Sequence, residues 1–142
     1  MKARVVLFTV LVMVVALISA LPAIAQEDQT DTKWLFDIWE GESRIRQAFA
    51  PQTKVRIEFK EKAGEIRFET LLTSSSSFVH GSRARGTAKV SADAVAMQGE
   101  YYAGGLTGGV SYFLTRKGDL LDGTGIGGGN IPFSISLRKV KQ

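Results

Sequence analysis

The sequence predicts an all-β protein, folded as an eight-stranded antiparallel up-and-down barrel, with a two-sheet β-sandwich as the alternative. Apolar and polar residues alternate with the period of two that is typical of strands, through most of the chain after residue 37. Glycine, aspartate and asparagine recur between these segments, where tight turns require them. The connections are short, so neighbouring segments are expected to pair antiparallel, whereas a Greek-key sandwich would need a longer crossing connection.

The first residues of this 142-residue chain are typical of a secretory signal peptide. Lys2 and Arg4 precede a long apolar run, Pro22 ends it, and Ala23–Ala25 has the small-x-small pattern of a cleavage site. We therefore expect residues 1–25 to be removed and the protein to be periplasmic or secreted. An uncleaved membrane anchor is the alternative, since ~17–25 apolar residues can span a bilayer. No membrane span is expected after cleavage.

The rest of the chain is long enough for one domain with its own core. We expect an N-terminal arm over residues 26–36 and the barrel over residues 37–142. The chain has no cysteine, and its formal net charge is +4, part of which comes from the signal segment. These features predict no disulfide and no nucleic-acid partner. No cofactor is expected, and the protein is expected to be a monomer.

The first half of the barrel domain has strands with one charged face. Trp34–Trp39 is dense in aromatic residues, which predicts either a short helical turn that plugs one end of the fold or the start of a strand. From Trp39 onward, every second residue up to residue 46 is charged. Thr53–Lys60 shows the same alternation, and Glu65–Leu72 returns after a turn at Gly64. The charged faces are expected to meet water.

The second half has smaller side chains. Gly81–Val90 places alanine and glycine on its inward face, and Leu120–Ile126 has an ambiguous facing because Leu120 and Leu121 compete. Closure of the barrel requires the last strand to pair with the strand that begins near Trp39, which removes exposed edges. In the last strand the inward residues are expected to be Ile131, Phe133, Ile135 and Leu137. The expected strands are residues 38–49, 53–61, 64–73, 81–91, 94–102, 107–116, 119–126 and 131–140.

Several segments together resemble a known group of barrels. They are Trp39-Glu40-Gly41-Glu42, Gly99–Tyr102, Gly118–Gly125 and Ile131–Leu137. The first looks like the W-x-G opening of calycin-type barrels, the group that holds lipocalins, fatty-acid-binding proteins and avidins. The whole pattern is similar to the small lipocalin-like domains of exported bacterial proteins. This resemblance implies the barrel fold and says little about activity.

The inward-facing side chains define the candidate binding site. Small residues at Ala84, Gly86, Ala88 and Gly99 leave room in a barrel that is otherwise lined by large apolar side chains. An eight-stranded barrel is just wide enough to be filled by its own side chains or to hold one small ligand. We therefore expect a small apolar molecule in the barrel. The candidate ligand-binding residues are Trp39, Phe59, Phe68, Met97, Tyr101, Tyr112 and Phe133.

The same small residues also allow a solid barrel. The aromatic side chains of Trp34–Trp39 are able to fold in and fill the space that the small residues leave. A solid barrel would be an envelope protein-interaction or structural module, with contacts made by the loops at Ser74–Gly81 and Tyr102–Gly109. This is the alternative function.

Catalysis is not expected, and no catalytic or metal-binding residue is assigned. His80 is the one histidine, and Ser74–Ser77 precede it, but the nucleophile motif G-x-S-x-G is missing. A metal site needs several convergent ligands, whereas the carboxylates here fall on outward faces.

Gly123-x-Gly125-x-x-Gly128 matches the dinucleotide pattern G-x-G-x-x-G. That pattern binds a nucleotide only between a strand and a helix N-terminus, and here an alternating strand follows. The glycines are therefore expected to serve turns and barrel curvature. Arg83 and Arg85 share one face, which is either an anion-binding site or a solvated outer surface.

Overall fold

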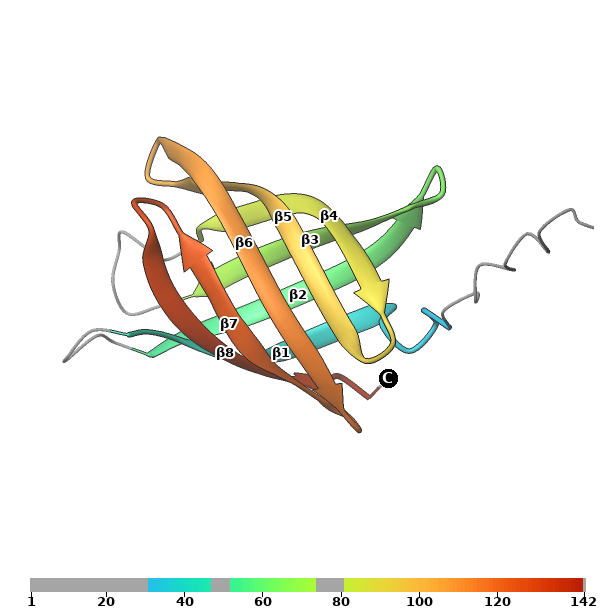
Figure 1. Ribbon diagram of the computed structural model, residues 1–142. Helices are drawn as coiled ribbons and strands as arrows, with labels where there is room; N and C mark the ends of the chain where they lie inside the picture. The colour runs from blue at the N-terminus through green and yellow to red at the C-terminus, as the bar shows by residue number, and fades with distance from the viewer. Residues whose placement is uncertain (1–30, 47–51, 74–80, 142) are drawn as a thin grey trace, which may run out of the picture.

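The computed structural model describes residues 31–46, 52–73 and 81–141. The described residues form eight strands and contain no helix (Figure 1). The strands are β1 (Asp37–Ile45), β2 (Gln52–Lys62), β3 (Glu65–Thr73), β4 (Arg83–Ser91), β5 (Ala94–Ala103), β6 (Leu106–Lys117), β7 (Leu120–Gly127) and β8 (Ile131–Lys139). The prediction of eight strands is confirmed. The predicted signal peptide, Ser74–Ser77 and His80 lie outside the described residues.

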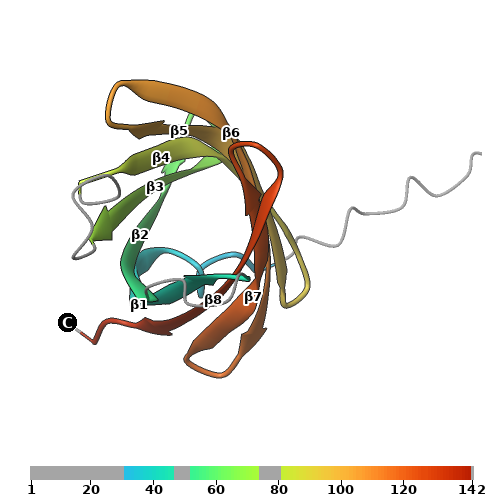
Figure 2. The ribbon, with the colours of Figure 1, turned by 90° about the vertical axis from the view of Figure 1, so that its left-hand side faces the viewer.

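The strands close into a barrel in which each strand pairs antiparallel with its neighbour in sequence. Closure lies between β1 and β8, where Trp39 stands opposite Lys139 and Gly41 opposite Leu137. This pairing confirms that the last strand joins the first, and it excludes the two-sheet sandwich. Seen from one end, the strands form a ring (Figure 2). The architecture is compatible with a calycin-like fold.

The register shows that the strands run obliquely around the barrel. Starting at Glu40 on β1, one can step from each residue to the residue opposite it on the next strand until β6 is reached. The steps lead through β2–β5 in one direction around the barrel and through β8 and β7 in the other. They reach Thr107 in one direction and Lys117 in the other, ten residues apart. A stagger of this kind requires strands inclined by ~35–45° to the barrel axis. The ends of neighbouring strands are therefore offset from one another.

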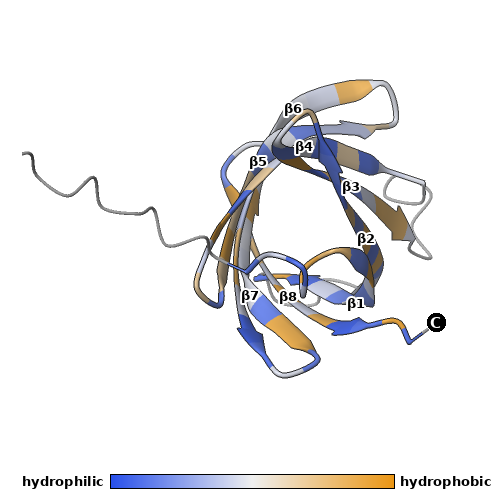
Figure 3. Cartoon of the chain, turned by 90° about the vertical axis from the view of Figure 1, so that its right-hand side faces the viewer, coloured by the Kyte–Doolittle hydropathy of each residue, from blue (hydrophilic) through white to orange (hydrophobic). Residues whose placement is uncertain are grey.

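All eight strands contribute apolar side chains to one core. Hydrophobic and hydrophilic residues alternate along the strands, as expected (Figure 3). The largest fully buried apolar side chains are those of Trp39, Leu35, Ile57, Met97, Leu114, Leu121, Leu137 and Val95. Burial settles the facing of β7, because Leu121 is fully buried and Leu120 only partly. The prediction that Ile131 points into the core is wrong. Ile131 is 38% exposed because it pairs with Gly127 at the rim, beside the β7–β8 turn.

The inward glycines bring neighbouring backbones close together. Gly86 on β4 lies opposite Gly99 on β5. A Cβ added to Gly86 would fall 2.0 Å from the carbonyl oxygen of Gln98, and one added to Gly99 would fall 2.0 Å from that of Arg85. At these positions only glycine fits the bend of the wall. The room expected at Gly86 and Gly99 is thus taken up by the backbone of the neighbouring strand.

Residues 32–36 close one end of the barrel, which we call the plugged end. The N–H of Leu35 donates to the carbonyl of Thr32 at 3.0 Å, which forms a turn. Leu35 is fully buried, and its carbonyl accepts the indole N–H of Trp39 at 2.9 Å. Trp34 packs edge-on against Trp39, and the guanidinium of Arg116 lies 4.3 Å from the centroid of the Trp34 ring. The aromatic segment thus forms the predicted plug, and the first strand begins directly after it.

Candidate functional site

The candidate ligand-binding residues come together inside the barrel and contact one another there. Five of them are buried, with 0–6% of their area exposed, namely Trp39, Phe59, Phe68, Met97 and Tyr112. Tyr101 and Phe133 are partly buried and pack against this cluster. A side chain that exposes 0–3% of its area borders no space large enough for water. The interior around the first four is therefore filled by the protein itself.

A row of three aromatic rings inside the barrel lies beside the hydroxyl of the buried Thr70. Tyr112 lies edge-to-face between Phe68 and Phe133, with ring centroids 5.8 and 5.4 Å away. Burial raises the pKa of Tyr112 to about 12, because the ionised phenol would lose its hydration. The nearby Thr70 hydroxyl offsets part of this rise in pKa. The geometry is nevertheless too poor for a hydrogen bond, and Thr70 Oγ1 has no partner among the described residues.

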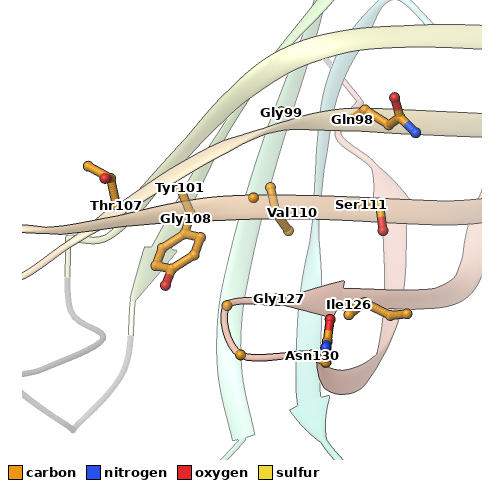
Figure 4. Close-up of a pocket in the computed structure, with 13 residues that line it drawn as sticks. Gln98, Gly99, Tyr101, Thr107, Gly108, Val110, Ser111, Ile126, Gly127 and Asn130 are labelled. Atoms are coloured by element: carbon orange, nitrogen blue, oxygen red, sulfur yellow. The ribbon is translucent and has the colours of Figure 1, made fainter.

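A cleft lies at the end of the barrel opposite the plug, which we call the open end. β6 pairs with β5 from Leu106 onward, but with β7 only from Ser111. The β5–β6 hairpin and the β7–β8 turn therefore diverge, and a cleft of about 580 Å³ lies between them (Figure 4). It is lined by Gln98, Gly99, Tyr101, Thr107, Gly108, Gly109, Val110, Ser111, Ile126, Gly127, Gly128, Gly129 and Asn130.

Tyr101 projects from β5 into this cleft, between β6 and the β7–β8 turn (Figure 4). Two glycines make room for its ring. A Cβ on Gly108 would lie 2.4 Å from Cε1 of Tyr101, and a Cβ on Gly128 would lie 2.0 Å from the phenol oxygen. The aromatic ring is therefore held between two backbone segments, and it remains partly exposed.

The backbone of β6 contributes polar groups to the same cleft. The β5–β6 turn consists of two glycines with positive φ, as in a type I′ turn. The hydrogen bond that closes such a turn joins the two flanking residues, Ala103 and Leu106. Because antiparallel strands alternate the direction of their backbone groups, Thr107 and Gly109 direct N–H and C=O away from β5. Pairing with β7 begins further along, so these groups face the cleft.

The cleft is uncharged, in contrast to the outer face of β1–β4. Its polar side chains are amides and hydroxyls, on Gln98, Tyr101, Thr107, Ser111 and Asn130. On β1–β4 the outward residues form ion pairs such as Arg56–Glu40 at 3.2 Å. Arg83 and Arg85 both approach Glu69, at 3.6 and 3.3 Å. The two guanidinium groups thus share one carboxylate on the neighbouring strand and are more than half exposed, which favours a solvated surface over an anion-binding site.

Apolar side chains also gather on the outer face of β5–β8. Ala96 pairs with Phe113, and Ile126 pairs with Pro132. Phe113 is 58% and Ile126 is 49% exposed, and the two are diagonal neighbours across β6 and β7. We call these four residues the outer stripe. The sequence alone predicted neither the stripe nor the cleft. A signal was present in the outward positions of Phe113 and Ile126, but their proximity depends on the register.

The remaining motifs give no further site. Gly123 and Gly125 lie within β7, and Gly128 lies in the next turn. β8 follows directly, so the prediction that a strand and not a helix follows this motif is confirmed. In the part of the chain that the structure describes, no three histidine, cysteine, aspartate or glutamate residues converge to hold a metal ion. Across the same described ranges, no helix has the length and apolar character to cross a membrane.

No family model matches the sequence, and no curated protein or solved structure matches it. The function must therefore be inferred from the geometry of the barrel itself.

Proposed function

We propose that this protein is an exported, non-catalytic binding protein that holds a small uncharged molecule in the cleft at the open end of the barrel. The observation that carries the proposal is the uncharged cleft of about 580 Å³ around Tyr101. Ligand sites are typically ~300–1,000 Å³, with apolar and aromatic walls and a few placed polar groups. Here Val110, Ile126 and Tyr101 supply the apolar and aromatic walls. Gln98 and Asn130 supply some of the polar groups.

Burial favours the open end over the barrel interior. Trp39, Met97 and Phe59 are at most 2% exposed, so a molecule beside them would have to displace them. Tyr101 and Phe133 are the two candidate residues that stay partly exposed, and Tyr101 lines the cleft. A molecule that enters at the open end meets Tyr101 without rearrangement of the core.

The chemistry of the lining favours binding over catalysis. The lining contains no histidine, cysteine, lysine, aspartate or glutamate. General acid–base catalysis is most efficient with a group that titrates near the working pH. The hydroxyls of Thr107 and Ser111 have no histidine or carboxylate beside them in the lining. The cleft thus has the parts of a binding site.

Protein-observed NMR with a library of uncharged fragments tests this proposal. We expect shifts of the backbone amides of Gly108, Gly109 and Gly128, and their loss in Tyr101→Ala. Tyr102→Ala is the matched control, because this neighbouring ring lies on the outer face and is 46% exposed. Shifts that centre on the buried aromatic row would place the ligand in the interior. A library without any binder would contradict the proposal.

A second candidate function, a protein-interaction module, is favoured by the outer stripe. Large apolar side chains exposed side by side are typical of interaction surfaces. A photo-crosslinking amino acid at position 113, compared with the same amino acid at exposed Lys89 on β4, tests this function in the native host. A defined protein adduct from position 113 alone supports it. Equal labelling from both positions would count against it.

Export is proposed from the signal-like segment. N-terminal sequencing of the protein from its native cells should give a chain that begins at Gln26, in the periplasmic or extracellular fraction. A chain that begins at Met1 and stays in the cytoplasm would overturn the proposed export.

A further inference from the structure

We infer that the cleft at the open end binds a neutral saccharide, with one sugar ring packed against Tyr101 and its hydroxyls bonded to the surrounding amides and hydroxyls. This inference rests on the proposed function and names the chemical class of its ligand.

The polar groups of the cleft both donate and accept hydrogen bonds. The amides of Gln98 and Asn130 each carry an oxygen acceptor and an NH₂ donor, and the hydroxyls of Thr107 and Ser111 each act in both senses. The outward N–H and C=O of Thr107 and Gly109 add further donors and acceptors. Sugar hydroxyls are also donors and acceptors, so a polyhydroxylated ligand matches a mixed lining of this kind. Several glycines in the walls let such a ligand approach the backbone closely.

Tyr101 supplies the apolar contact that a sugar ring needs. The faces of a pyranose present C–H groups, and an aromatic ring packs against such a surface while its own hydroxyl stays hydrogen-bonded. Gly108 and Gly128 hold the hydroxyl end of this ring between β6 and the β7–β8 turn. The ring is thus positioned before the ligand arrives, which reduces the entropy lost on binding.

The absence of charge in the lining narrows the ligand class. A carboxylate or phosphate buried in the cleft would find no cationic side chain among the lining residues. The free-energy cost of removing its charge from water would therefore not be offset. A purely apolar molecule would cover the amides, the hydroxyls and the backbone groups that β6 directs into the cleft, without replacing their hydrogen bonds to water. A neutral molecule with many hydroxyls avoids both costs.

The test is a titration of the isotope-labelled protein with maltotriose, cellotriose and triacetylchitotriose, each followed by amide shifts. Trigalacturonic acid, of similar size but anionic, is the comparison ligand. We expect at least one neutral trisaccharide to shift the amides of Gly108, Gly109 and Gly128, with binding about tenfold or more weaker in Tyr101→Ala. Tyr102→Ala should bind like the wild type. Asn130→Gly removes one amide while accepting the φ of 59° at that position, and it should weaken binding without loss of fold.

The outcomes separate the inference from the proposed function. If other uncharged fragments bind in the cleft and none of the trisaccharides does, the saccharide inference is wrong and the binding function stands. Equal binding of the anionic trisaccharide, or equal binding by Tyr101→Ala and the wild type, would also overturn the inference. If neither fragments nor saccharides bind, both the saccharide inference and the proposed binding function are wrong.

Discussion

The phenol oxygen of Tyr101 lies directly beside Gly128, at a point only 2.0 Å from where a Cβ of that residue would stand. The two residues are far apart in the chain, and they meet because β6 diverges from β7 at the open end. The aromatic ring occupies the gap where the ladder between these strands stops.

Gly128→Ala should therefore push the Tyr101 ring out of its position. The added methyl cannot share space with the phenol oxygen, and the side chain is free to rotate toward solvent. We expect faster nitration of Tyr101 and weaker binding of any ligand of the cleft. Gly127→Ala is the matched control, because its Cβ would meet its nearest neighbour at 3.8 Å, an ordinary contact. Unchanged nitration in Gly128→Ala would show that the ring does not occupy this position.

Gly86→Ala and Gly99→Ala should each unfold the barrel or destabilise it by more than about 3 kcal/mol. In both, the new methyl would lie 2.0 Å from a backbone carbonyl oxygen of the adjacent strand, which cannot move without opening the wall. Gly109→Ala is the control, since nothing lies within 4 Å of its Cβ. That change should stay within about 1 kcal/mol of the wild type. Urea unfolding measures all three, and equal stabilities would refute the close-approach explanation.

Trp39→Phe should destabilise the plugged end by about 2–4 kcal/mol. It leaves the buried carbonyl of Leu35 without the indole N–H that it accepts at 2.9 Å, and it leaves a cavity. Trp34→Phe replaces the partly buried indole beneath the Arg116 guanidinium with a smaller phenyl ring, and a loss of about 1 kcal/mol is expected. Thermal unfolding of the two variants checks that Trp39→Phe loses more stability than Trp34→Phe. A larger loss from Trp34→Phe would mean that stacking outweighs the buried hydrogen bond.

Tyr112 should make the barrel less stable at high pH. Its pKa is raised from 10.0 to about 12 in the folded protein, so the unfolded chain loses the proton first as the pH rises. Stability from this group is fully present below pH ~10 and is lost progressively up to about pH 12, by about 2–3 kcal/mol. Tyr112→Phe should remove this component. The measurement is urea unfolding over that pH range, read as the difference between the variant and the wild type. Parallel pH profiles would mean that Tyr112 is not buried as described.

Much of the fold follows from local pattern. Alternation places Val55, Ile57 and Phe59 on the inner face, and the short turns leave antiparallel pairing of neighbours as the simplest arrangement. The pairing of the last strand with the first was predictable because an open meander would leave two exposed edges. Ile131 was misplaced, because alternation gives the face of a strand and does not say where the barrel ends.

The candidate site depended on facts that the sequence does not contain. The inward set with Tyr101, Tyr112 and Phe133 was predicted, but alternation could not decide whether that set encloses a space. In the structure the core side chains fill the interior, and at Gly86 and Gly99 the backbone of the adjacent strand takes up the space that the missing side chains leave. The sequence by itself thus determined the strands, their order and their faces, since these arise from interactions between residues close in the chain. Only the tertiary structure decided the stagger of ten residues, and with it the gap beside β6 that Tyr101 occupies. The reason is that register accumulates around a closed barrel, so it belongs to all eight strands together and to no single segment.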